Sequence, residues 1–245
     1  MGHIKPRAEL ELEDAMLVEG LPGIGLVGKI ATDHLVEVFD MELYATVHCE
    51  GLARIGVYHT DDREVLPPVR IYADEETNLV ALQSDVPVKS EAIGEFSGCL
   101  TKWLTAEGIT PIYLSGMPAE RDGDPTLYGV STGDAGSLLD EADIDEPSEN
   151  GVVSGPTGAL LNRAVESGLD SVGLVVESDP QFPDPAASKV LIEDGIAKLT
   201  GLDVDVSELV ERAAEIREQK EKLAQRMQEA EEEESSQAQP LRMYQ

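Results

Sequence analysis

The sequence is poor in basic residues. Lysine and arginine together number 18 against 49 aspartate and glutamate residues, which gives a formal net charge of −31. A nucleic-acid-binding face needs clustered lysine and arginine, and the sequence contains no such cluster, so nucleic acid is excluded as a partner. The acidic residues are spread along the whole chain, which is typical of proteins that work in concentrated salt, where screening removes self-repulsion. The composition therefore indicates a halophilic protein.

The chain also has few cysteines and no membrane-length apolar segment. Its two cysteines, Cys49 and Cys99, lack neighbours at the spacing of metal ligands or redox motifs, so we expect buried thiols in a reducing compartment. No apolar run approaches the ~20 residues of a membrane span, and the first residues do not read as a signal peptide. We therefore expect no membrane association and a cytoplasmic location.

Histidine is the remaining source of metal ligands, and the chain has four. The strand pattern places His48 beside His59 on adjacent strands, close to Cys49. Neighbouring residues on a strand point to opposite faces, so His48 and Cys49 cannot easily share a metal ion. The sequence therefore predicts no metal site.

Strand-like and helix-like patterns alternate along residues 15–200. The helical spacing predicts helices over residues 26–39, 90–108, 135–139, 156–167 and 185–200. Strands are expected over residues 15–20, 43–48, 54–59, 69–73, 79–84, 111–116, 127–130 and 171–177. Such alternation is typical of an α/β layered sandwich. We predict this fold over residues 1–205, with a largely parallel, partly mixed central sheet.

The character of the chain changes after residue 201. Asp205 and Ser207 offer an N-terminal cap, and a long helix is predicted over residues 206–234. Its apolar positions step by four and three, as in a heptad seam: Leu209, Ala213, Ile216, Leu223, Met227 and Ala230. This seam favours oligomer contact or projection of the tail; a helix lying on its own domain is the alternative. Residues 235–245 are predicted to form a disordered tail.

A glycine-rich loop follows the first apolar strand. Gly23, Gly25 and Gly28 have the spacing of the dinucleotide-binding fingerprint, and Glu50 follows where a ribose-binding acid is found. The same loop matches most of a phosphate-binding P-loop, but Ile30 stands where a magnesium-binding hydroxyl is required. One hypothesis is therefore an enzyme that binds a nucleotide or nucleoside phosphate in this loop. The alternative is that the glycines allow a helix to pack closely on a strand.

No set of residues assembles a nucleophile, a base and an orienting group. Ser154 and Thr157 begin a predicted helix and are expected to cap it. Asp184 is expected to cap the last helix of the domain. Glu177 and Asp179 follow a predicted strand at the edge where α/β sheets place ligands, which makes them positions to inspect. The sequence therefore predicts no catalytic residues and no cofactor.

The last three residues, Met243, Tyr244 and Gln245, read hydrophobic-tyrosine-any and end in a carboxylate. They follow a polar stretch that has nothing with which to form a core. Capture of a C-terminal carboxylate together with an adjacent side chain is a known recognition mode, and a frayed terminus is the alternative. Because aromatic residues make up only 4% of the chain, a tyrosine in this position favours a docking role.

Four segments of the chain resemble the archaeal proteasome assembly chaperone family: residues 19–29, 113–116, 155–161 and 183–188. The glycine-rich segment, Glu-Gly-Leu-Pro-Gly-Ile-Gly-Leu-Val-Gly-Lys, is the most specific of them. The resemblance covers roughly residues 10–205. It implies an α/β sandwich related in layout to nucleoside phosphorylases, without an established catalytic role.

The resemblance also implies a function, that of an ATP-independent chaperone or activator that contacts the α-subunit ring of the core proteasome. Several proteins of this type end in hydrophobic-Tyr-X, which Met243-Tyr244-Gln245 matches at every position. The terminal carboxylate would pair with a lysine in a pocket between two α subunits. Several tails on one homo-oligomer would bind by avidity, and a paralogous chaperone is the alternative partner to a second copy.

Overall fold

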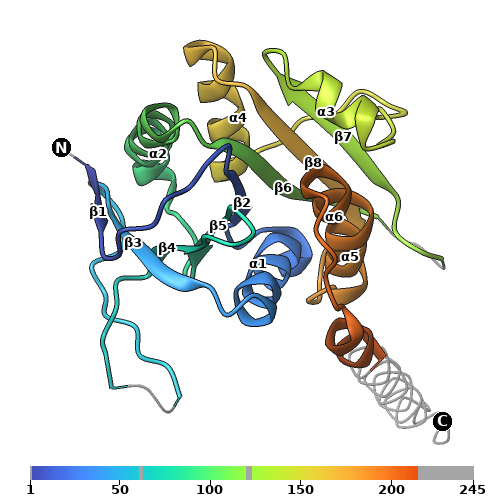
Figure 1. Ribbon diagram of the computed structural model, residues 1–245. Helices are drawn as coiled ribbons and strands as arrows, with labels where there is room; N and C mark the ends of the chain where they lie inside the picture. The colour runs from blue at the N-terminus through green and yellow to red at the C-terminus, as the bar shows by residue number, and fades with distance from the viewer. Residues whose placement is uncertain (1, 61–62, 120–122, 215–245) are drawn as a thin grey trace, which may run out of the picture.

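Eight strands form one sheet in the computed structural model of the chain, which describes residues 2–60, 63–119 and 123–214. The strand order is β1-β3-β4-β5-β2-β6-β8-β7 (Figure 1). The strands are β1 (His3–Pro6), β2 (Met16–Gly20), β3 (Glu42–His48), β4 (Val69–Asp74), β5 (Leu79–Ser84), β6 (Thr110–Pro118), β7 (Leu127–Thr132) and β8 (Ser171–Ser178). The helices are α1 (Val27–Val38), α2 (Ile93–Glu107), α3 (Gly136–Glu141), α4 (Gly155–Ser167), α5 (Pro185–Val190) and α6 (Ala197–Thr200). Three further short helical segments are the 3-10 turns η1 (Ile24–Leu26) and η2 (Ser90–Ala92) and the π-helical segment η3 (Leu191–Ile196).

The sheet is mixed and is not largely parallel, so the predicted strand direction was wrong for much of it. Three neighbouring pairs are parallel, β2–β5, β2–β6 and β6–β8. Four pairs are antiparallel, β1–β3, β3–β4, β4–β5 and β7–β8. Only residues 75–78 connect β4 to β5, and so short a connection can join only antiparallel strands. The parallel pairs lie in the middle of the sheet, where α2 leads into β6 and α4 leads into β8.

Helices cover both faces of the sheet, which confirms the predicted α/β layout. Helices α1 and α5 and segment η3 lie on one face, and α2 and α4 lie on the other (Figure 1). Alternate residues of β2 enter opposite apolar cores: Val18 packs in the core beneath α1, and Leu17 packs in the core beneath α2. Burying one such side chain stabilises the fold by roughly 1.5–3 kcal/mol. The central strand β2 therefore holds the two helical layers together.

One predicted strand is not formed. Residues 54–59 belong to a projecting arm between β3 and β4 (Figure 1), in which Val57 makes an isolated antiparallel bridge to Leu66. Apolar side chains on the arm remain uncovered, since Tyr58 is 79% exposed and Ile55 is 48% exposed. The alternating pattern predicted a strand of the sheet, but residues 54–59 do not pair with any strand of the sheet.

The histidines are not arranged as the sequence indicated. His59 is exposed on the arm, while His48 stacks on His3, with 5.2 Å between the ring centroids. Cys49 is buried and Cys99 half-buried, and both are free thiols. The described residues contain no group of three or more side chains suited to holding a metal ion.

The predicted C-terminal helix is described only at its start. Residues 207–214 are helical, and the backbone N–H of Ser207 donates to the Asp205 carboxylate at 2.9 Å. Leu209 is fully buried in the core of its own domain, so the first position of the seam is occupied by intramolecular packing. The rest of the helix and the tail, residues 215–245, lie outside the described residues. Within the described ranges, no helix is both long enough and apolar enough to cross a membrane.

Candidate functional site

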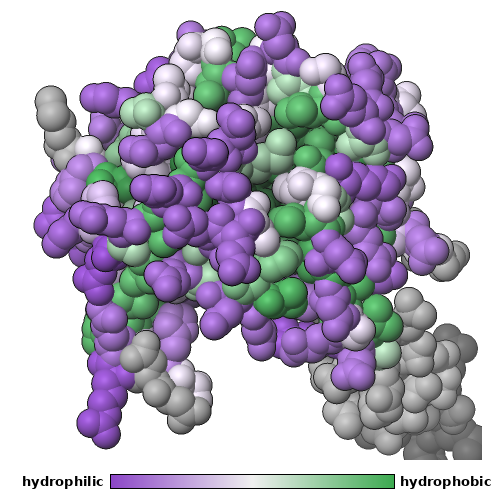
Figure 2. All heavy atoms as spheres, in the orientation of Figure 1, coloured by the Kyte–Doolittle hydropathy of each residue, from purple (hydrophilic) through white to green (hydrophobic). Residues whose placement is uncertain are grey.

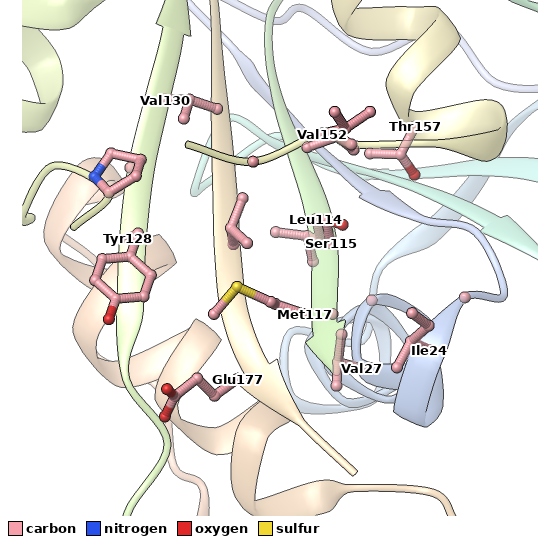
Figure 3. A pocket seen from close by; sticks show the side chains of 18 of the residues that line it. Ile24, Val27, Leu114, Ser115, Met117, Tyr128, Val130, Val152, Thr157 and Glu177 are labelled. Carbon is pink, nitrogen blue, oxygen red and sulfur yellow. The ribbon is translucent and has the colours of Figure 1, made fainter. Parts of the chain in front are cut away.

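A large cavity opens at the carboxyl ends of the parallel strands β2, β6 and β8 (Figure 3). Its volume is about 1610 Å³. The glycine-rich loop after β2, the end of β6, the middle of β7 and the segment leading into α4 form its walls. Ligands of open α/β sheets bind at such carboxyl ends, where the strand order reverses. Strand β2 is the point of reversal here, because β5 lies on one side of it and β6 on the other.

Two of the three loop glycines are required by close packing. Gly25 has a left-handed backbone with φ of 60°, and a Cβ atom there would lie 1.9 Å from the Ser178 hydroxyl oxygen. The Gly25 carbonyl accepts a hydrogen bond from the backbone N–H of Asp184 at 2.8 Å. A Cβ atom on Gly28 would lie 3.2 Å from the Glu19 carbonyl oxygen, where α1 crosses β2. At Gly23, by contrast, a Cβ atom would meet nothing within 4 Å.

This difference between the glycines gives a stability prediction. Replacing Gly25 by alanine is expected to lower the free energy of unfolding by about 2–4 kcal/mol, because left-handed backbone strain adds to the clash with Ser178. Replacing Gly23 by alanine is the matched control, with an expected change within about 0.5 kcal/mol. Chemical denaturation of both variants measures the two values. Equal losses at both positions would contradict the packing role of Gly25.

Glu19 lies beneath the glycine-rich loop and is fully buried. Its carboxyl oxygens accept hydrogen bonds from the backbone N–H groups of Leu21 at 3.1 Å and Leu114 at 3.2 Å. The Thr157 hydroxyl also donates to the carboxyl group, at 3.1 Å. One side chain therefore connects β2, the loop, β6 and the start of α4.

Burial changes the acidity of this side chain. Desolvation raises the pKa of Glu19 to about 8, although the hydrogen bonds from Leu114, Leu21 and Thr157 act in the opposite direction. Glu19 in turn contributes to raising the pKa of Tyr113, for which burial is the main cause. The Tyr113 hydroxyl has no hydrogen-bond partner among the described residues. Sequence reasoning missed Glu19 as a structural residue, although an acid inside the apolar run of β2 was a usable signal.

The charges around the cavity do not suit a phosphate. Its described lining contains the carboxylates of Asp140, Glu146, Glu149 and Glu177 and no lysine, arginine or histidine. A nucleotide phosphate in this cavity would therefore meet several negative charges without a compensating positive side chain. Most of the chain's acidic residues lie at the surface, and hydrophilic side chains predominate on the face in Figure 2.

The proposed ribose-binding acid is also misplaced. Glu50 follows β3, and strands β4 and β5 separate β3 from β2. In a dinucleotide-binding fold the acid ends a strand adjacent to the glycine-rich loop. The expectation for Glu50 was wrong because the strand that follows α1, β3, lies three positions away from β2 in the sheet rather than next to it.

The remaining predicted positions are mostly structural. Asp184 caps α5 by accepting the backbone N–H of Ala187 at 3.1 Å, which confirms its expected role. Asp179 accepts the backbone N–H of Gln181 at 2.8 Å, which braces the loop after β8. Thr157 bonds to Glu19 instead of capping α4, and Ser154 stands at the cap position without a side-chain hydrogen bond. Glu177 lines the cavity, whereas Met243, Tyr244 and Gln245 lie outside the described residues.

Comparisons with known proteins find sequence similarity over most of the chain. A protein-family model described as the PAC2 family matches residues 17–224. An uncharacterised protein of Methanocaldococcus jannaschii is 27% identical over 222 residues, which are 89% of each chain.

Two solved structures from Pyrococcus furiosus are similar over nearly the whole chain. PbaA, described as an archaeal homologue of proteasome-assembly chaperone, has a TM-score of 0.80 and 26% identity over 96% of this chain and 97% of its own. PbaB, described as an archaeal proteasome activator, has a TM-score of 0.78 and 25% identity over 91% of this chain and 98% of its own.

Proposed function

The chain belongs to the PAC2 family, and from this membership we propose that it is an ATP-independent proteasome assembly chaperone or activator. In this proposal the C-terminal Met243-Tyr244-Gln245 docks into pockets of the proteasome α-ring. The observation that carries the proposal is the combination of this ending with a fold similar to PbaA and PbaB over more than nine-tenths of the chain. We also propose a cytoplasmic location and assembly into a homo-oligomer.

The physical chemistry of the tail supports docking. The terminal carboxylate can form a charge-assisted hydrogen bond with a lysine of the α-ring. Tyr244 brings apolar area and a hydroxyl group that needs a partner, and Met243 can adapt to an irregular apolar contact. The predicted tail, residues 235–245, reaches on the order of 20 Å. One such contact is weak, but several tails on one oligomer bind by avidity.

The charges of the protein's own cavity disfavour binding of this tail. Carboxylates line the cavity, and its described walls hold no basic side chain with which a terminal carboxylate could pair. The same charges give no support to the alternative of an enzyme that binds a nucleotide or nucleoside phosphate in the glycine-rich loop. We therefore place the function in partner binding rather than in catalysis.

Deleting Met243 to Gln245 tests the proposal directly. We expect the deletion to abolish pull-down of the proteasome α-ring in concentrated salt, because it removes both the carboxylate and the aromatic contact. Replacing Tyr244 alone by alanine is expected to weaken binding by at least about thirtyfold, as for a hot-spot residue. Replacing Gln239 by alanine, upstream in the same tail, is the matched control and should leave binding unchanged.

Thermal unfolding of each variant shows whether the fold is intact. Undiminished capture of the α-ring by the deleted chain would remove the tail from the mechanism. Two further assays separate the two roles within the proposal: acceleration of α-ring formation from free subunits indicates an assembly chaperone, and stimulated peptide hydrolysis by the mature particle indicates an activator.

A further inference from the structure

The fold brings the two cysteines of the chain to one place. Cys49 directly follows β3, whereas Cys99 lies in α2, and strands β4 and β5 separate the two along the chain. Cys49 belongs to the apolar core beneath α2, and Cys99 packs against that core. A hydrogen bond joins the two thiol groups. The structure therefore assembles a thiol pair that the spacing in the sequence did not indicate.

The position of Gly2 shows that the two sulfur atoms border one space. Strand β1 pairs antiparallel with β3 and matches His3 with His48, and continuing this register sets Gly2 opposite Cys49. A Cβ atom on Gly2 would lie 3.2 Å from the Cys49 sulfur and 3.1 Å from the Cys99 sulfur. The backbone of Gly2 therefore lies over both sulfur atoms, and a glycine leaves them the room to approach each other.

The chain that follows Cys49 turns against the beginning of α2. The Cys49 carbonyl accepts the backbone N–H of Leu52 at 3.3 Å. A Cβ atom on Gly51 would lie 3.0 Å from the Cβ atom of Ala92, which immediately precedes α2. This turn begins the projecting arm between β3 and β4 (Figure 1). A bond between the two sulfur atoms would therefore fix the beginning of the arm to α2.

The two thiols differ in exposure and in acidity. Cys49 is 7% exposed, whereas Cys99 is half-buried beside β1, which is an edge strand of the sheet. The hydrogen bond between the thiols lowers the pKa of Cys99 and raises the pKa of Cys49. The Lys102 ammonium also lowers the pKa of Cys99, although burial and the Glu95 carboxylate oppose this. Because the thiolate is the nucleophile, Cys99 is the thiol that reacts first with a small reagent.

We propose that Cys49 and Cys99 are a reversible redox pair, which a low-molecular-weight disulfide oxidises to an intramolecular disulfide that fixes the arm to α2. The Cys99 thiolate attacks one sulfur of the small disulfide, which releases one small thiolate and leaves a mixed disulfide on Cys99. Cys49 then loses its proton and attacks the Cys99 sulfur, and the second small thiolate leaves. The protein thiols are oxidised, the small disulfide is reduced, and the protons of the protein thiols end on the two small thiols. Disulfides of cytosolic proteins are usually transient and catalytic or redox-sensing, which agrees with the location proposed above.

Mass spectrometry of the full chain after incubation with oxidised glutathione tests the pair. The incubation is done in concentrated potassium chloride at about pH 8, where a thiol is partly ionised. The folded chain should lose two hydrogen atoms, retain no glutathione and recover its mass on reduction with dithiothreitol. Peptide mapping should locate the new bond between Cys49 and Cys99. A glutathione that stays attached, a disulfide between two chains, or two unreacted thiols would each overturn the proposal.

Single substitutions test the order of attack. The Cys49→Ser chain should retain one glutathione on Cys99, because no second thiol is present to displace it. The Cys99→Ser chain should react at least about tenfold more slowly, because Cys49 is buried. Cys49→Ala repeats the first measurement without adding a buried hydroxyl group. Equal rates for the two serine variants would overturn the role of Cys99 as the attacking thiol.

Thermal unfolding tests whether the disulfide fits the folded structure. The midpoint of the oxidised chain should lie about 4–10 °C above that of the reduced chain, because the bond restricts the unfolded state. The chain with both cysteines replaced by serine is the matched control, and the oxidant should leave its midpoint unchanged. Equal midpoints for the oxidised and reduced wild type, or the same shift in the control, would overturn the proposed bond to α2. The chain lacking Met243 to Gln245 should form the same disulfide, so failure of the tail proposal and failure of this one are distinguishable.

Discussion

Replacing Glu19 by alanine is expected to lower the free energy of unfolding by about 2–5 kcal/mol. The substitution leaves the backbone N–H groups of Leu21 and Leu114 without their acceptor at a position that is fully buried. Each unsatisfied buried donor costs roughly 1–3 kcal/mol, while the Thr157 hydroxyl can turn toward the cavity that it lines. Urea denaturation at neutral pH measures the loss.

Replacing Glu19 by glutamine removes the titrating group but also one of the two backbone hydrogen bonds, because Leu21 and Leu114 donate to different oxygens and the amide NH2 group cannot accept. Because burial raises the pKa of Glu19 to about 8 in the folded chain, the folded state holds a proton that the unfolded state releases above its ordinary value of about 4.5. The stabilisation that protonated Glu19 gives the folded state is therefore fully present below about pH 4.5, and it is lost as the pH rises through about 8. Glutamine does not titrate, so its variant should lack this decline.

The comparison between the wild type and the glutamine variant isolates this one group. All other carboxylates and histidines titrate in both chains, so their effects cancel in the difference of the two free energies of unfolding. We expect that difference to shift in favour of the glutamine variant between about pH 5 and pH 8. Parallel pH curves would mean that Glu19 is ionised in the folded chain throughout this range.

The helices of the domain could be predicted from the sequence because their apolar residues repeat at 3.6-residue spacing. The structure places α1 at Val27–Val38 and α4 at Gly155–Ser167, within one residue of the predicted bounds. Strand direction could not be predicted in the same way, because alternation has a period of two whether neighbours are parallel or antiparallel. The short connection between β4 and β5 is the one sequence signal of strand direction, because it can join only antiparallel strands.

The apolar centre of the cavity could not be predicted from residue types, although Glu177 was expected at the sheet edge where the cavity opens. Its apolar centre joins Leu114, Met117, Val130 and Val152, which come from three segments that are separated in the sequence by other elements. The glycine-rich loop was found but remained ambiguous, since the same spacing serves phosphate binding and close packing. What separates the two is the surroundings of Gly25, where the Ser178 hydroxyl leaves no room for a side chain.

Replacing Arg70 by methionine is expected to lower the free energy of unfolding by about 3 kcal/mol. Arg70 is 1% exposed in β4 and donates to the Asp85 carboxylate at 2.6 Å, to the Pro67 carbonyl at 2.9 Å and to the Tyr72 hydroxyl at 3.1 Å. Breaking a buried ion pair costs roughly 3–5 kcal/mol. The lower end applies because the Asp85 side chain is 20% exposed and keeps Lys29 at 3.7 Å.

A second substitution tests whether the cost comes from the isolated carboxylate. Replacing Asp85 by asparagine in the Arg70→Met chain should restore more than half of the loss, because it removes the unpaired charge. The matched control is Arg7, which pairs with Glu64 at an exposed site where the two side chains are 40% and 51% exposed. Replacing Arg7 by methionine should change the free energy of unfolding by less than about 0.5 kcal/mol. Concentrated salt screens exposed pairs more than buried ones, so the Arg70 effect should persist there. If the Arg70 and Asp85 losses simply add, the two side chains are not energetically coupled, and the buried pair is not what holds β4 to the loop after β5.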